Sequence, residues 1–185
     1  PQAVPPIWFM RQAGRYHSHY QKLRKKYTFE ELCKIPELSA EVACGPIDDF
    51  DYDVAILFSD ILFPLEILGL GLSYSPGPTF SNYLTPLSSV EKIPNDLIEE
   101  NLGFQAKAIK LTIDSLPNDK SLVGFVGGPW TILSYGLNLK NKIQVDIFNE
   151  EPFIQKLLYD VMMPLLKKNI EMQLKAGAEI IYIFD

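Results

Sequence analysis

Four short apolar runs divide the chain, and none of them contains a charged residue. They span residues 7–10, 54–58, 122–126 and 180–184. Continuous apolar runs of this length predict strands that are buried on both faces. Between them lie longer segments in which apolar positions recur with the spacing of a helix. Strands that alternate with helices predict a parallel sheet with helices outside it.

The first helical segments carry clear start signals. Thr28 is followed three residues later by Glu31, which has the form of a capping box at the start of a short helix. Pro36 fits the first turn of a helix that runs to about residue 50, because a proline there lacks only an N–H group that would be unpaired anyway.

Two longer helices follow. Residues 97–116 place apolar side chains on one face, which predicts an amphipathic helix. Another helix is predicted over residues 152–175, with a kink at Pro164, since proline removes a helical hydrogen bond. Residues 73–89 are rich in Ser, Pro, Gly and Thr and predict a loop after the second strand.

This order of elements predicts an α/β fold, and more specifically part of a (β/α)8 TIM barrel. Such a barrel typically takes ~250 residues, so four strands in 185 residues correspond to about its first half. The chain starts at Pro1 and stops at Asp185, directly after the last apolar run. We therefore expect residues 1–185 to be a single domain, a truncated part of the barrel.

Composition narrows the class of protein. Hydrophobic residues make up 47% and charged residues 22%, which favours a folded core. The formal net charge of −6, without a basic face, argues against a nucleic-acid partner. No run of 18 apolar residues and no signal peptide is visible, so no membrane partner is expected. Cys33 and Cys44 lack disulfide or zinc spacing, which predicts buried free thiols in a reducing compartment, the cytoplasm.

The arginines are distributed unevenly. All three, Arg11, Arg15 and Arg24, lie within fourteen residues, while the other basic residues are lysines spread along the chain. A guanidinium group is a planar fork that binds carboxylates through paired hydrogen bonds. The first two arginines directly follow an apolar run, so the pattern favours a strand that ends in an anion-binding loop. A chance cluster on a solvated face is the alternative.

Polar or turn-forming residues follow each of the four runs. They are Arg11, then Ser59 and Asp60, then Gly127-Gly128-Pro129, and finally Asp185. In parallel α/β folds, ligand chemistry gathers at the carboxyl ends of the strands. We therefore expect these groups to converge in space.

Four segments together resemble one protein family. The run Pro6-Ile7-Trp8-Phe9-Met10-Arg11-Gln12-Ala13-Gly14-Arg15-Tyr16 resembles the signature of uroporphyrinogen decarboxylase, and this motif is long and specific. Three shorter segments, at residues 57–62, 124–135 and 176–185, fit the family in the right order. The resemblance covers essentially the whole chain.

The resemblance implies a (β/α)8 barrel of which this chain covers the N-terminal half. It implies a lyase that acts on a tetrapyrrole substrate, converting uroporphyrinogen III to coproporphyrinogen III in haem biosynthesis by loss of four acetate carboxyl groups. The family uses no metal and no organic cofactor, and the full-length protein is expected to be a homodimer. The family's later serine and C-terminal histidine lie beyond this chain, so half a barrel is expected to be inactive alone.

The resemblance also assigns roles to residues of the first motif. Arg11 and Arg15 match ligands of the substrate carboxylates. Gln12 and the backbone amides of Ala13 and Gly14 are expected to add hydrogen-bond donors. Arg11 is also counted as catalytic, but the proton donor stays open, because a guanidinium group releases its proton only above about pH 12.

Two further residues match the family's catalytic and substrate-binding positions. Asp60 matches its central aspartate, which accepts hydrogen bonds from the pyrrole N–H groups and offsets the positive charge that develops on the ring. A helix N-cap is the alternative role for Asp60. Tyr135 matches a tyrosine that contacts a substrate carboxylate and the aspartate, with a core tyrosine as the alternative. Asp185 is expected to have either a structural or a catalytic role.

The sequence departs from the family after Tyr16, where members usually continue with a Leu-Pro-Glu-like turn. His17 and His19 are found there instead, and no cysteine or acidic pair is spaced to complete a metal site with them. We expect these histidines to be exposed or adjacent to substrate. Two other functions stay open: a related barrel methyltransferase that handles corrinoid-linked methyl groups with zinc, and a non-catalytic tetrapyrrole-binding fragment.

Overall fold

The computed structural model describes residues 4–86, 91–139 and 152–185. These residues form two compact units. The first consists of residues up to 60 together with 103–125 and 172–182, and the second of residues 61–102, 126–171 and 183–185. Helices combined with parallel strands confirm the predicted α/β class.

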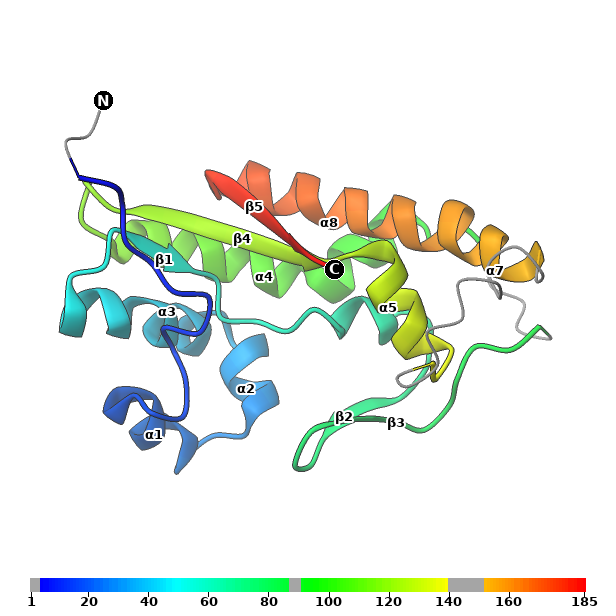
Figure 1. Cartoon of the computed structure of the whole chain (residues 1–185), viewed down its shortest axis with the longest axis horizontal. Helices are drawn as coiled ribbons and strands as arrows, with labels where there is room; N and C mark the ends of the chain where they lie inside the picture. Colours follow the sequence, from blue (N-terminus) through cyan, green and yellow to red (C-terminus); the bar gives the residue numbers. More distant parts are fainter. Residues whose placement is uncertain (1–3, 87–90, 140–151) are drawn as a thin grey trace. The chain divides into compact units, whose positions relative to one another are not determined.

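Three of the four predicted strands form one sheet, in the order β1 (Val54–Ile56), β4 (Ser121–Gly127) and β5 (Ile180–Phe184). β1 and β4 run parallel, with Val54 opposite Ser121. Every residue of β1 is buried, and so is every residue of β4 after Ser121, as the apolar runs predict. Figure 1 shows β4 between β1 and β5.

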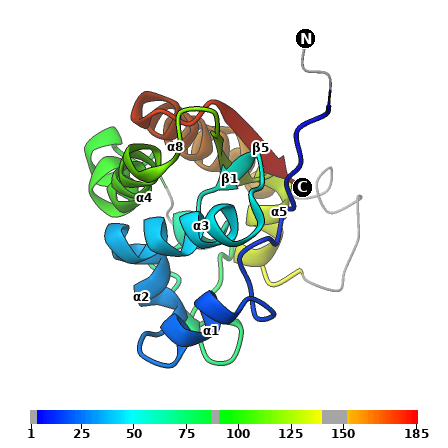
Figure 2. The same ribbon diagram turned by 90° about the vertical axis from the view of Figure 1, so that its left-hand side faces the viewer.

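The prediction of a strand at residues 7–10 is wrong. This segment is irregular, and one backbone hydrogen bond, from the Asp53 amide to the Ile7 carbonyl (3.0 Å), joins it to the start of β1. Two prolines precede it and have no N–H group to give to a strand ladder. A turn from Phe9 to Gln12 then ends the extended stretch. Ile7 is 51% exposed, and Figure 2 shows the segment, in dark blue, passing beside β1 and β5.

The first unit contains α1 (Ser18–Arg24), α2 (Phe29–Lys34) and α3 (Pro36–Phe50). The predicted capping box is present, because the Thr28 hydroxyl accepts from the Glu31 amide and the Glu31 carboxylate accepts from the Thr28 amide. Pro36 lies in the first turn of α3, as predicted. In Figure 1, α1 and α2 lie on the side of α3 away from β1.

α4 (Asn95–Ser115) confirms the helix predicted over residues 97–116. Ile98, Leu102 and Ile109, on the predicted apolar face, are fully buried. Ile113 on the same face is exposed, so the stripe is covered over only part of its length. Within the described ranges, no helix is long and apolar enough to cross a membrane.

The second unit replaces part of the predicted loop with regular structure. After a short 3-10 helix, η1 (Phe63–Leu65), β2 (Leu72–Tyr74) and β3 (Pro78–Phe80) pair antiparallel. The predicted loop at 73–89 therefore contains most of a hairpin, and its last residues, 87–89, lie outside the described residues.

The helix predicted over residues 152–175 is present in three parts. They are α7 (Pro152–Lys156), a π-helical segment η2 (Leu157–Met162) and α8 (Met163–Ala176). The π-helical segment ends just before Pro164, which has no N–H group for the regular ladder. The predicted disturbance at this proline therefore takes the form of π-helical turns.

Candidate functional site

The arginine loop, residues 9–17, is closed by hydrogen bonds of its own backbone. The Gln12 amide donates to the Phe9 carbonyl (3.0 Å), and the His17 amide donates to the Gly14 carbonyl (2.9 Å). The Tyr16 hydroxyl donates to the Gln12 carbonyl, which joins the two turns. The loop is therefore a defined double turn, held by hydrogen bonds between its own residues.

Gln12 attaches the arginine loop to the sheet. Its side chain is 1% exposed; the amide nitrogen donates to the Val54 carbonyl (2.9 Å), and the amide oxygen accepts from the Phe9 amide (3.1 Å). Both polar ends of Gln12 therefore bind backbone. A direct contact between Gln12 and substrate stays a prediction.

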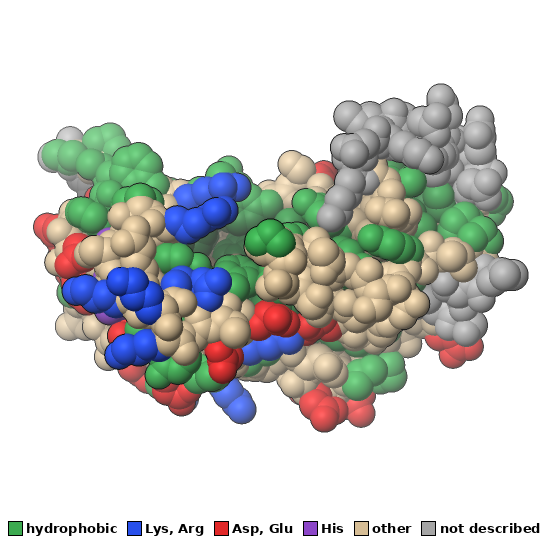
Figure 3. All heavy atoms as spheres, turned by 90° about the horizontal axis from the view of Figure 1, so that it is seen from below, with side chains coloured by type: hydrophobic (Ala, Val, Ile, Leu, Met, Phe, Trp, Pro, Cys, Tyr) green, Lys and Arg blue, Asp and Glu red, His purple; other side chains and the backbone are tan. Residues whose placement is uncertain are grey.

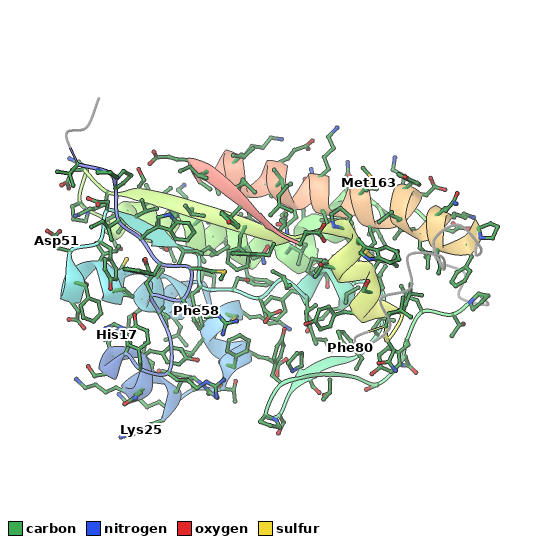
Figure 4. The ribbon with its side chains drawn as sticks, viewed as in Figure 1. His17, Lys25, Asp51, Phe58, Phe80 and Met163 are labelled. Carbon is green, nitrogen blue, oxygen red and sulfur yellow. The ribbon has the colours of Figure 1, made fainter. Side chains whose placement is uncertain are left out.

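His17 was predicted to be either exposed or adjacent to substrate, and the structure shows that it is buried, so only the second environment stays a prediction. It is 3% exposed, and its Nε2 lies 2.7 Å from an Asp49 carboxylate oxygen on α3. Gly45, one turn earlier on α3, makes room for both histidines: a Cβ atom there would lie 2.8 Å from His19 Cδ2 and 3.2 Å from His17 Cε1. In Figure 4, His17 lies where α1 begins, on the side facing α3.

Arg11 and Arg15 are exposed, as ligands of a soluble anion must be. The backbone amides of Ala13 and Gly14, between them, make no hydrogen bond to another residue that the structure describes. Four donor groups of one short segment are thus without a hydrogen-bond partner among the described residues. Figure 3 shows lysine and arginine side chains, in blue, gathered on this part of the first unit.

Arg24 has a different environment from the other two arginines. Its guanidinium group donates to the Tyr27 carbonyl (2.6 Å). Burial raises the pKa of Tyr20, while the positive charges of Arg24 and Arg15 oppose that rise. Arg24 therefore holds the chain that follows α1.

Asp60 follows β1 at the end of a segment that is fixed on two sides. The Ser39 hydroxyl on α3 donates to the Phe58 carbonyl (2.8 Å), and the Gln105 amide on α4 donates to the Ser59 hydroxyl (2.9 Å). No α-helix begins at Asp60, because the next helical turn is η1, capped by Leu62. The alternative role of Asp60 as a helix N-cap is therefore wrong.

A hydrophobic cluster brings the arginine loop and the end of β1 together. Its buried members are Tyr20, Leu23, Leu32 and Val42, and both Ala13 and Phe58 pack against it. Electrostatics agree with this placement: burial raises the pKa of the Cys33 thiol, and the carboxylate of Asp60 raises it further. The first unit therefore contains the arginine loop and Asp60, and one cluster supports Ala13 of the loop and Phe58, two residues before Asp60.

Tyr135 belongs to the second unit, on α5 (Pro129–Gly136), where it is half-buried. Its predicted contact with Asp60 stays a prediction. Asp185, in the same unit, has a structural contact: its Oδ1 accepts from the Thr131 hydroxyl (2.9 Å) and more weakly from the Thr131 amide (3.3 Å). The carboxylate thus caps the first turn of α5, whose N-cap residue Gly128 has no side chain.

Sequence reasoning missed Ser39, Asp49 and Gln105. They bind Phe58, His17 and Ser59, which are neighbours in the chain of predicted site residues. One signal was available for Gln105, because it interrupts the apolar stripe of α4 between Leu102 and Ile109. Among the described residues, no group of three or more His, Cys, Asp or Glu side chains is arranged to hold a metal ion.

The geometry defines a class: an α/β chain with a parallel sheet, in which a basic loop and a carboxylate stand near the carboxyl end of one strand. The sequence model of the family described as uroporphyrinogen decarboxylase (URO-D) matches residues 1–185. The chain therefore belongs to the uroporphyrinogen decarboxylase family.

Curated relatives agree with this assignment. The chain is 38% identical over 184 residues to the uroporphyrinogen decarboxylase of Geotalea uraniireducens and 41% identical over 186 residues to that of Geobacter sulfurreducens. It is 40% identical over 194 residues to that of Campylobacter jejuni. These matches cover 97–100% of this chain but 54–56% of the relatives, so the chain spans about half their length.

A solved structure supports the fold. A methyltransferase from Methanosarcina mazei superposes with a TM-score of 0.66, covering 84% of this chain and 49% of that protein. Sequence identity is 18%, so this likeness concerns the fold alone.

Proposed function

We propose that this chain is the N-terminal half of a uroporphyrinogen decarboxylase, which removes the four acetate carboxyl groups of uroporphyrinogen III to give coproporphyrinogen III. The observation that carries the proposal is the arginine loop, which presents Arg11 and Arg15 on the same cluster that supports the strand end before Asp60. The substrate is a polyanion and the chain has a net charge of −6, so attraction must be local to this loop.

The chemistry explains why this enzyme needs both arginines and a carboxylate. Protonation of the pyrrole ring carbon creates a cation that accepts the electron pair left when the acetate C–C bond breaks and CO2 leaves. The exocyclic carbon then takes up a proton to become a methyl group, and the ring proton is released. One proton is thus consumed per CO2, and no oxidant or reductant is needed.

In this scheme Arg11 and Arg15 bind acetate or propionate groups of the substrate. Asp60 accepts hydrogen bonds from the pyrrole N–H groups and stabilises the ring cation as it forms. Tyr135 contacts a substrate carboxylate, with Gln12 and the Ala13 amide as further contacts. The proton donor stays unassigned, and the scheme uses neither a metal nor an organic cofactor.

The proposal extends to the whole protein. Residues 1–185 form a single domain with the rest of a (β/α)8 barrel, and the complete protein is a cytoplasmic homodimer. The three-stranded sheet, the family match over the whole chain and the half-length coverage of the relatives support the barrel, whereas the homodimer and the cytoplasmic location rest on the family resemblance alone. By itself, the chain is expected to be inactive.

The test is an anaerobic assay of the complete protein with uroporphyrinogen III, followed by chromatography of the products. Seven-, six-, five- and four-carboxyl products without added metal are expected. A folded protein that binds porphyrin but releases no CO2 would instead favour the tetrapyrrole-binding alternative. Methyl transfer from a corrinoid, with no decarboxylation, would favour the methyltransferase alternative.

Asp60→Asn is the matched variant for this assay. It keeps the shape of the side chain but removes the negative charge, so it is expected to abolish turnover while porphyrin binding stays measurable. Near-normal turnover would overturn the role given to Asp60.

A further inference from the structure

The side chain of Gln105 is a buried polar group in the apolar stripe of α4. It is 2% exposed, and Nε2 donates to the Ser59 hydroxyl (2.9 Å). Its other polar atom, Oε1, is buried and has no hydrogen-bond partner among the described residues. Leu102 and Ile109, one turn away on either side, are fully buried apolar residues.

This arrangement is unfavourable for stability alone. A buried carbonyl oxygen without a partner loses its hydration and gains nothing in return. A methionine has nearly the volume of glutamine and would fill the same space without that loss. What glutamine provides and methionine does not is the hydrogen bond to Ser59.

Ser39 contributes a second hold on the same segment. It is fully buried on α3, and its hydroxyl donates to the Phe58 carbonyl (2.8 Å). Two helices thus fix two consecutive residues, one through its backbone and one through its side chain. The next residue along the chain is Asp60.

We propose that Gln105 is a positioning residue that orients Asp60 by fixing the rotamer of Ser59. This inference rests on the proposed function, because it assigns a role in the same site. The Ser59 hydroxyl accepts the amide proton of Gln105, and this fixes the side chain and the adjoining peptide. Asp60 is then directed before substrate arrives, which is the preorganisation that charge stabilisation in a transition state requires.

The experiment compares Gln105→Met and Ser59→Ala in the complete protein with Thr112→Val as the control. Thr112 is a fully buried polar residue on the same helix, but its hydroxyl donates to the Ala108 carbonyl within that helix. We expect kcat to fall about tenfold or more in Gln105→Met, because small misplacements of catalytic groups lower the rate by such factors. KM is expected to change by less than about twofold. Thr112→Val should keep kcat within about twofold of the wild type.

A double-mutant cycle separates positioning from a general loss of stability. If Gln105 acts through Ser59, the Gln105→Met/Ser59→Ala double variant has nearly the kcat of the worse single variant. Multiplicative losses, or an equal fall in kcat for Gln105→Met and Thr112→Val, overturn the proposal. Ser59→Ala removes one hydroxyl from a half-buried site, so it keeps the test valid if Gln105→Met fails to fold.

A measurement that does not require enzymatic turnover distinguishes failure of this inference from failure of the proposed function. Backbone hydrogen exchange of the peptide covering residues 57–63 is expected to be faster in Gln105→Met than in Thr112→Val. Equal exchange in the two variants overturns the positioning role. A wild type without decarboxylase activity would overturn the proposed function, and the exchange rates would still decide whether Gln105 holds this segment.

Discussion

The Nε2 atom of His17 lies 2.7 Å from a carboxylate oxygen of Asp49 and joins the end of the arginine loop to the last turn of α3. The side chain of His17 is buried and that of Asp49 is half-exposed, so the bond lies at the surface of the first unit.

The first prediction concerns this link. His17→Leu removes the hydrogen bond but fills the buried space, and it is expected to lower the free energy of unfolding by about 1–2 kcal/mol. Urea unfolding of the complete protein measures this. The matched control is His19→Leu, since His19 lies 3.6 Å from Glu41 and is one-third exposed, where an ion pair contributes less than about 1 kcal/mol. Equal losses in the two variants would contradict the special role of His17.

The second prediction concerns Gly45, in the middle of α3. A glycine inside a helix costs about 1 kcal/mol relative to alanine, so Gly45→Ala should stabilise the protein if space were available. The new Cβ atom would instead lie 2.8 Å from the ring of His19 and 3.2 Å from that of buried His17. We therefore expect Gly45→Ala to lower the melting temperature.

Gly103 provides the control for this substitution. It also lies inside a helix, α4, but an added Cβ atom would meet nothing within 4 Å. Gly103→Ala is expected to raise stability by about 0.5–1 kcal/mol, the ordinary gain in helix propensity. A gain of the same size at Gly45 would show that the histidine rings give way easily.

These contacts indicate how far the sequence could predict the structure. The strands at β1, β4 and β5 and the capping box at Thr28 were predictable, because apolar runs and cap residues act locally. The segment at residues 7–10 was not, since its apolar residues suggested a buried strand while its place at the sheet edge leaves Ile7 exposed. An apolar run carries no information about how many neighbours it will have.

The site shows the same limit. The motif identified Arg11, Arg15 and Asp60, but the groups that hold them come from distant parts of the chain. Gln12 binds a carbonyl 42 residues away and Gln105 a hydroxyl 46 residues away. Such pairs depend on how the helices pack against the sheet. The periodicity of apolar residues predicts the class of fold but not which side chains meet. Gln105 had a signal in the sequence, as a polar residue in an apolar stripe, but its partner Ser59 was not predictable.

The third prediction concerns pH and the capping box. Hydrogen bonds from the Thr28 amide and hydroxyl lower the pKa of Glu31 in the folded protein. A lowered pKa means that this contribution to stability is full above the ordinary pKa of glutamate and is lost as pH falls through the folded value. Thr28→Ala is expected to cost about 1 kcal/mol at pH 7, as N-cap substitutions do.

The difference between wild type and Thr28→Ala should then shrink on acidification. Unfolding measured at a series of pH values between 7 and 3 tests this. A difference that grows as the pH falls below 4 would contradict the sign of the linkage.

The fourth prediction concerns the two cysteines, which are free thiols as the sequence indicated, although Cys44 is only half-buried. Burial raises the pKa of Cys44 from 9.0 to about 11, with the charge of Asp48 as a smaller cause, and raises that of Cys33 well above its ordinary value. Thiolate is the reactive form, so alkylation of both residues at pH 8 should be slow in the folded protein and fast in urea. Peptide mass spectrometry distinguishes the two sites.

The raised pKa of Cys44 also makes the stability of the protein depend on pH in the alkaline range. The folded protein keeps the Cys44 proton where the unfolded chain has released it, so the contribution is full below pH 9 and is lost as pH rises towards 11. Cys44→Ser is expected to make the free energy of unfolding less dependent on pH between about pH 9 and 11. Rapid alkylation of Cys44 in the native state at pH 8 would contradict the assigned environment.

The last prediction distinguishes Arg15 from Arg24 by what each guanidinium group binds. Arg15 is exposed in the arginine loop, whereas the guanidinium group of Arg24 already donates to the Tyr27 carbonyl. Lysine keeps the charge but cannot bind a carboxylate through two parallel hydrogen bonds.

Under the proposed function, Arg15→Lys should raise KM about tenfold, because a charge-assisted hydrogen bond contributes about 1.5 kcal/mol or more. Arg24→Lys should leave KM within about twofold, since its partners belong to the protein. Added salt should raise KM for the wild type, as screening weakens attraction between exposed charges. Equal effects of the two substitutions, or a KM independent of salt, would mean that the arginine loop is a solvated basic surface and that the carboxylates of the substrate are bound elsewhere.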